Sequence, residues 1–144
     1  MFLQHIIDII ESVAPLSYQE DWDNSGLQVG NRSADISSAL LTTDVTEPVV
    51  REAITRHCNL IVSHHPLLYR GLKTISGNTP QERIVETAIR NGIAIYSSHT
   101  AMDAYLHGVS GRMAEKLGVA DYRLLVSTGE SCGLGVIGKL PEPV

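Results

Sequence analysis

The sequence predicts an α/β fold with a mostly parallel sheet and helices on its faces. Short apolar runs typical of buried strands alternate along the chain with segments whose apolar residues recur at helical spacing. Such alternation indicates βαβ units, in which the strands are parallel and the crossovers right-handed. At 144 residues and 15.7 kDa, we expect residues 1–144 to form a single α/β domain.

The first predicted element is an amphipathic helix over residues 2–13, where apolar side chains lie at helical spacing and polar ones lie opposite. Pro15 ends this helix. Residues 17–35 are rich in turn-forming side chains and are predicted to form a loop. An apolar run at 39–45 then predicts a buried strand, and renewed helical spacing predicts a helix over 46–57.

The strand–helix pattern is repeated in the next part of the chain. Residues 60–63 form a second apolar run, and a loop over 67–78 follows. A helix begins at Thr79, which is suited to cap it, because Pro80 takes the first helical position and Glu82 lies three residues after the cap. The remaining predicted elements are a strand at 93–97, a helix at 109–117 and a strand at 134–138.

Composition and charge argue against several classes of protein. The net charge is −5 and basic residues are scattered singly, so we expect no binding to nucleic acid. No apolar run approaches the roughly 18 residues of a membrane span, and the N-terminus lacks the features of a signal peptide. Cys58 and Cys132 are too few for a disulfide framework, and reduced thiols predict a cytoplasmic protein.

Three polar clusters fall where the predicted strands end. Asp44 follows the first strand, His64 and His65 follow the second, and His99 with Asp103 follows the third. In parallel sheets, ligands bind beyond the carboxyl ends of the strands. Adjacent side chains on a strand point to opposite faces, but a turn just past the strand end allows both histidines to face one cavity.

These residue types indicate a metal site, because imidazole is the commonest metal ligand and a carboxylate can bridge two ions. We predict two divalent ions, of Zn, Fe, Mn, Co or Ni, held by His64, His65 and Asp103. His99 is interpreted as a catalytic proton carrier, with a ligand or a hydrogen-bond partner of a ligand as alternatives. The competing interpretation is structural: one histidine of the pair is packed, the other is solvated, and Asp103 caps a helix or turn.

The predicted ligands leave the metal coordination incomplete, since a zinc ion alone takes about four. Asp44 and Glu130 are the remaining acids to consider. Asp44 is either a strand-end cap, or a metal ligand or a residue that contacts a ligand, whereas we expect Glu130 to be a solvated loop residue. Two ions roughly 3.5–4 Å apart would lower the pKa of a bridging water and polarise a carbonyl or phosphoryl oxygen.

Three motifs carry a resemblance to a known family. They are Trp-Asp-Asn-Ser-Gly-Leu-Gln-Val-Gly at 22–30, Val-Ser-His-His-Pro-Leu at 62–67, and Ser-His-Thr at 98–100 followed by Asp103. In order and spacing they resemble the dinuclear metal centre family known as GTP cyclohydrolase 1 type 2 homologue. The resemblance implies a two-metal site with ligands at His64, His65 and Asp103, in a ring-shaped homohexamer whose metal sites face an internal cavity. The family name implies hydrolytic opening of a purine-type ring, and binding and regulatory roles are also discussed for its members.

Family members are usually much longer than this chain, and their C-terminal segment supplies a further His and Glu as ligands. Residues 1–144 resemble the N-terminal half, so we expect the C-terminal part to be absent. Two functions are predicted as alternatives. The first is a metal-dependent hydrolase-like protein that acts on a nucleotide or a purine-type ring through metal-activated water. The second is a non-catalytic metal-binding or assembly module.

The segment around Trp22 has two interpretations. In the functional one it lines the cavity, and Asn24 and Gln28 contact a ligand. In the structural one, which we favour, a buried Trp22 anchors a turn that Gly26 permits. The segment lacks the Gly-Lys-Ser/Thr ending of a phosphate loop, and the chain contains no nucleophile elbow motif.

Overall fold

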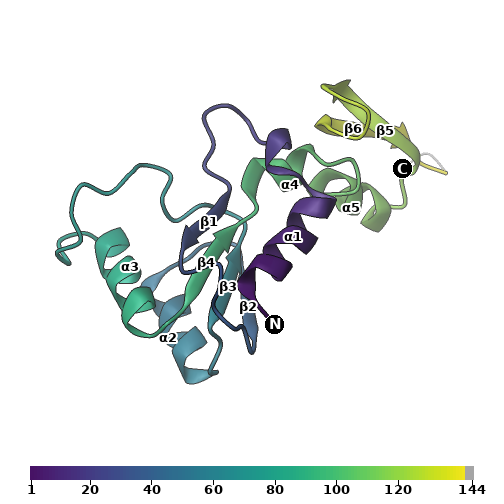
Figure 1. The fold of residues 1–144 in the computed structure, drawn as a ribbon. Helices are drawn as coiled ribbons and strands as arrows, with labels where there is room; N and C mark the ends of the chain where they lie inside the picture. The colour runs from purple at the N-terminus through teal and green to yellow at the C-terminus, as the bar shows by residue number, and fades with distance from the viewer. Residues whose placement is uncertain (142–144) are drawn as a thin grey trace.

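The computed structural model describes residues 1–141, and its main feature is a four-stranded sheet with the strand order β1-β4-β3-β2 (Figure 1). The strands are β1 (Gly26–Val29), β2 (Ala39–Thr42), β3 (Leu60–Ser63) and β4 (Ala94–Ser97). β2, β3 and β4 are parallel to one another, and β1 pairs with β4 in the antiparallel sense. The predicted α/β class with a mostly parallel sheet is therefore confirmed.

Helices cover both faces of this sheet. α1 (Leu3–Val13) packs on one face, and α2 (Glu47–Thr55) and α3 (Pro80–Arg90) pack on the other (Figure 1). Because successive strand residues point to opposite faces, Leu60 joins the α1 side of the core and Ile61 joins the α2–α3 side. The apolar stripe of each helix thus packs against one of the two apolar faces of the sheet.

The helix starts follow the predicted capping chemistry. The Thr46 side chain accepts a hydrogen bond from the backbone N–H of Val49, and the Thr79 side chain accepts one from that of Glu82. The Glu82 carboxylate does not return to the cap. It accepts instead from the backbone N–H groups of Ser76 and Asn78, so α3 holds the end of the loop that precedes it.

The chain after β4 forms two short helices and a two-stranded ribbon. These elements are α4 (His99–Ala104), α5 (Val109–Lys116), β5 (Ala120–Ser127) and β6 (Gly133–Lys139). β5 and β6 pair in the antiparallel sense, apart from the main sheet and against α5 (Figure 1). The predicted helix at 109–117 and strand at 134–138 are confirmed, whereas α4 and β5 were not predicted. A single 3-10 turn, η1 (Leu16–Tyr18), contacts α4.

Two predictions about the sheet are wrong. Residues 17–35 contain the strand β1 in addition to loop, because Gly26–Val29 gains its partner only from β4 in the folded chain. The strand at 39–45 ends at Thr42 and is an edge strand, in which the Leu41 side chain is 78% exposed. Within residues 1–141, β2 pairs with β3 alone, and its apolar side chains are only partly covered. Among residues 1–141, no helix has the length and apolar character needed to cross a bilayer.

Candidate metal centre

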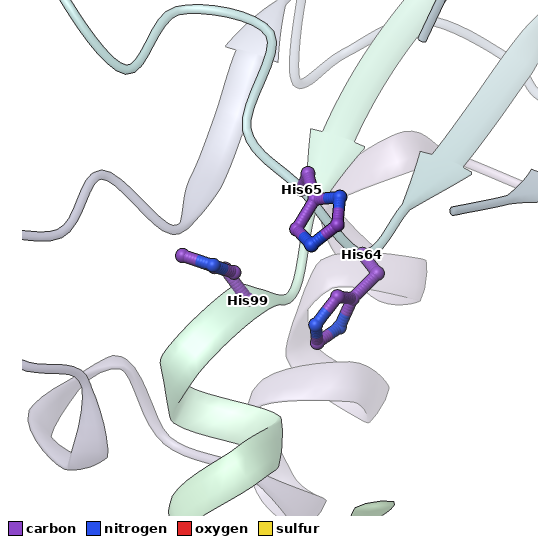
Figure 2. Close-up of side chains that lie close together, drawn as sticks. All are labelled: His64, His65 and His99. Atoms are coloured by element: carbon purple, nitrogen blue, oxygen red, sulfur yellow. The ribbon is translucent and has the colours of Figure 1, made fainter. Parts of the chain in front are cut away.

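Three histidines meet where β3 and β4 end. His64 and His65 directly follow β3, and His99 opens α4 just after β4. Figure 2 shows the three imidazoles facing a common space, and one nitrogen of each lies within 4.8 Å of the others. The ring centroids are 4.8 Å apart for His64 and His65, and 5.4 and 5.5 Å from these two to His99.

Hydrogen bonds fix the bend that turns both adjacent histidines toward this space. The backbone N–H of His64 donates to the carbonyl of Thr42, the last residue of β2, at 3.1 Å, and that of His65 donates to the carbonyl of Thr43 at 2.9 Å. The hydroxyls of Ser63 and Ser97 hydrogen-bond to each other at 2.8 Å, and that of Ser63 also donates to the His65 carbonyl at 2.9 Å. Both serines are buried, and the hydrogen bond between them joins the end of β3 to the end of β4.

Asp23 orients His99. Its side chain is fully buried, and Oδ1 accepts a hydrogen bond from His99 Nδ1 at 2.8 Å. Burial alone would raise the pKa of Asp23, but hydrogen bonds from Thr100, His99, Ser25 and Asn24 together hold that pKa well below its ordinary value. Because an ionised carboxylate only accepts, Nδ1 of His99 carries the proton and Nε2 keeps its lone pair for a cation or a proton.

Asp44 orients His65 in the same way, at the surface. Its Oδ1 lies 2.8 Å from His65 Nδ1, and the two side chains are 62% and 49% exposed. This contact again directs Nε2 of the ring toward the ligand space. Of the interpretations given to Asp44, this contact favours the one in which Asp44 hydrogen-bonds to a metal ligand.

Asp103, in α4, lies beside His64. Its Oδ2 is 3.7 Å from His64 Nε2, which is too long for a hydrogen bond. Two atoms that each ligate one ion at about 2.1 Å lie up to roughly 4 Å apart, so the separation suits shared coordination. Asp103 is outside the tight group formed by the three histidines, and Glu130 is an exposed residue of the β5–β6 turn. Three imidazole nitrogens and one nearby carboxylate oxygen are a donor set that fits a divalent transition-metal ion.

The loop around Trp22 differs from the favoured prediction. Trp22 is 57% exposed and not buried, because the loop folds around the carboxylate of Asp23 and leaves the indole outside. Asn24 and Gln28 make contacts within the chain: the Asn24 amide donates to the Leu68 carbonyl at 2.7 Å, and Gln28 Oε1 accepts from the Leu68 N–H at 3.1 Å. These two amides join the loop around Trp22 and the strand β1 that follows it to the loop after β3.

The sequence analysis did not identify Asp23 as the residue that hydrogen-bonds to His99 and orients it. The two residues are separated by 76 positions, and only the pairing of β1 with β4 brings their segments together. The signal present in the sequence was the Trp-Asp-Asn-Ser-Gly segment itself, whose acid precedes small polar residues. An open apolar cavity of about 680 Å³ lies elsewhere, between β1 with the segment after it, the loop before α3, and α3 itself, and none of the three histidines lines it.

Fold and site together define a mostly parallel α/β protein with a histidine-rich candidate metal centre at the carboxyl ends of its strands. The chain belongs to the Duf34/NIF3 (NGG1p interacting factor 3) family, whose model matches residues 1–144. The resemblance found in the three motifs is thereby confirmed.

Individual relatives agree with this assignment. The chain is 37% identical over 125 residues to the GTP cyclohydrolase 1 type 2 homolog of Bacillus subtilis, covering 87% of this chain and 34% of that protein. It is 42% identical over 118 residues to the protein of the same name from Clostridium perfringens, covering 82% and 45%. The crystal structure of a Bacillus cereus protein related to NIF3 superimposes with a TM-score of 0.83 at 37% identity, covering 90% and 35%. The chain thus spans from about a third to less than half the length of these proteins.

Proposed function

We propose that this chain binds divalent metal ions through His64, His65 and Asp103, and that the centre serves hydrolysis of a nucleotide or another purine-type ring. The convergence of three imidazole nitrogens within 4.8 Å, from the ends of two neighbouring strands, is the observation that carries the proposal. The names of the relatives support the direction of the chemistry, since GTP cyclohydrolase activity opens a purine ring by hydrolysis.

The contacts of each residue in the centre support a separate role for it in binding the metal or in the reaction. Asp44 holds the ring of His65, and the carboxylate of Asp103 stands beside His64. His99 presents Nε2 to the same space, where it either completes the ligand set or accepts and returns a proton during the reaction. A pair of divalent ions, of Zn, Fe, Mn, Co or Ni, would supply Lewis-acid activation of water and of the substrate oxygen.

Elemental analysis of the purified protein tests the metal centre. We expect bound divalent metal in the wild-type chain and a loss of most of it in His65→Ala, because two neighbouring donors cannot replace the third. His107→Ala is the matched control, since His107 lies outside the cluster and hydrogen-bonds to Tyr122. Hydrolysis of a nucleotide panel by the metal-loaded protein should disappear in His65→Ala and persist in His107→Ala. Full activity of metal-free His65→Ala would contradict the proposal.

A non-catalytic role in assembly is a second candidate, and exposed apolar side chains favour it. Leu41 on the edge strand β2 is 78% exposed, and Leu125, Val126 and Leu134 on the ribbon are 58%, 53% and 53% exposed. An edge strand also offers unpaired backbone groups to a partner strand. A homo-oligomer, a hexamer by family resemblance, would cover these surfaces. Sedimentation velocity tests this: Leu41→Lys should shift an oligomer toward monomer, and a wild-type monomer that turns over substrate would contradict the assembly role.

A further inference from the structure

Two large aromatic side chains stand exposed beside the histidines. Trp22 and Tyr69 are 57% and 52% exposed, and their ring centroids are 6.1 Å apart in an edge-to-face arrangement. The indole of Trp22 lies 6.0 Å from the imidazole of His99, again edge to face. Aromatic side chains usually gain most by burial, so a pair of exposed rings at the rim of a candidate site suggests a ligand that covers them.

The backbone on which these rings sit is held firmly. Trp22 precedes Asp23, whose buried carboxylate accepts hydrogen bonds from five donors, including the backbone N–H of Thr100. Tyr69 follows Leu68, whose C=O accepts from the side-chain amide of Asn24 and whose N–H donates to that of Gln28 in β1. The two rings therefore project from positions fixed against each other, which lowers the entropic cost of binding a ligand between or against them.

We infer that Trp22 and Tyr69 form a stacking surface for a flat heteroaromatic ring, and that this surface presents the ring to the histidine cluster. The inference rests on the proposed function, for which it names the residues that recognise the ring. Stacking on aromatic side chains selects flatness and π-electron area, so it accepts any nucleobase. A long polyanionic nucleic acid is disfavoured because the carboxylates of Asp23, Asp44 and Asp103 surround the histidines and the chain is acidic overall.

The chain itself provides the probe, because Trp22 is its one tryptophan. Guanosine, adenosine and uridine 5′-monophosphates are titrated against the indole fluorescence, with absorbance correction, beside ribose 5-phosphate, which lacks the ring. We expect saturable quenching by at least one nucleotide and none by ribose 5-phosphate. Tyr69→Ala should weaken that binding about tenfold or more, as expected for the loss of one stacking partner. Tyr69→Phe should retain the affinity, because the stacking face remains.

Phe2→Ala is the matched control. Phe2 is another exposed aromatic residue, 54% exposed, but it pairs with Asp35 before β2. It therefore lies near the amino ends of the parallel strands, whereas the histidines follow their carboxyl ends. It should bind nucleotide as the wild type does. Quenching by none of the three nucleotides, or unchanged affinity in Tyr69→Ala, overturns the inference.

Metal content, measured in the same samples by elemental analysis, separates this inference from the proposed function. Tyr69→Ala should keep its metal while losing affinity for the nucleotide. A wild-type protein that holds no metal yet binds the nucleotide through Tyr69 supports the stacking surface and removes the metal centre. A protein that holds metal but shows no ring-dependent quenching does the reverse.

Discussion

Replacing Asp23 with asparagine should lower the free energy of unfolding by about 1–3 kcal/mol. Oδ1 accepts from the Asn24 N–H at 2.7 Å and from His99 Nδ1 at 2.8 Å. Oδ2 accepts from the Ser25 hydroxyl at 2.8 Å and from the N–H of Thr100 at 3.1 Å, and also from the Thr100 hydroxyl. An asparagine offers one oxygen, so its NH2 group must face donors. The hydroxyls of Ser25 and Thr100 can rotate to accept from this NH2 group, whereas the Thr100 N–H cannot. A buried donor left without an acceptor accounts for the expected loss of about 1–3 kcal/mol.

Urea denaturation followed by circular dichroism measures the loss. Asp35→Asn is the control, because Asp35 is an exposed carboxylate whose 2.6 Å pair with the N-terminal ammonium should contribute no more than about 1 kcal/mol. The denaturation midpoint of Asp23→Asn should fall well below that of Asp35→Asn at an unchanged slope. An Asp23→Asn protein as stable as the wild type, to within about 0.5 kcal/mol, would refute the argument that the substitution leaves the Thr100 N–H without an acceptor.

The same carboxylate gives the stability a predictable dependence on pH. Burial raises the pKa of Asp23, but the hydrogen bonds that its carboxylate accepts lower it by more. The pKa in the folded protein is therefore below the ordinary 3.8. A group with a lowered folded pKa contributes stability that is complete above its unfolded pKa and is lost as the pH falls toward the folded one. The wild type should therefore lose stability more steeply than Asp23→Asn when the pH is lowered below about 4.

Two other substitutions probe the sheet and the site. Gly30→Ala should destabilise the protein by about 1–3 kcal/mol, because Gly30 has a φ of +125° and an added Cβ would lie 2.7 Å from that of Ala94. Gly71→Ala, with open space around it, should be nearly neutral in the same urea denaturation experiment. Asp44→Ala should weaken metal binding about tenfold or more, measured by competition with a chelator, because the ring of His65 loses its orienting carboxylate. A change in stability beyond about 0.5 kcal/mol in this exposed variant, or unchanged metal affinity, would count against that role.

The alternation of strands and helices could be predicted from local signals. Thr79 and Pro80 mark the start of α3 because capping acts within one turn, and the apolar run at 60–63 coincides with β3. β1 and the exposure of β2 could not be predicted in this way. Both depend on strand order: β1 exists through its pairing with β4, and β2 is exposed because it lies at an edge.

In the candidate site, too, some features could be predicted from the sequence and others depend on the tertiary structure. The convergence of His64, His65 and His99 followed from the rule that polar residues at parallel strand ends meet at one edge. The place of Trp22 did not follow, because its burial is decided by which neighbour the loop folds around. Here the loop encloses Asp23, whose charge requires several donors when it is removed from water, and the indole remains outside.

The geometry of the histidines is inherited from the register of the sheet. Ser63 and Ser97 are paired across β3 and β4, so their hydroxyls meet on one face at 2.8 Å. Ser97 donates to Ser63, and Ser63 donates to the His65 carbonyl at 2.9 Å. A slip of one residue would send either hydroxyl to the opposite face. The slip would also shift His99 along the sheet edge relative to the histidine pair. The positions of Ser63 and Ser97 therefore explain why two hydroxyls are buried among apolar neighbours. Only in the correct register are their hydrogen bonds made and the three histidines brought together.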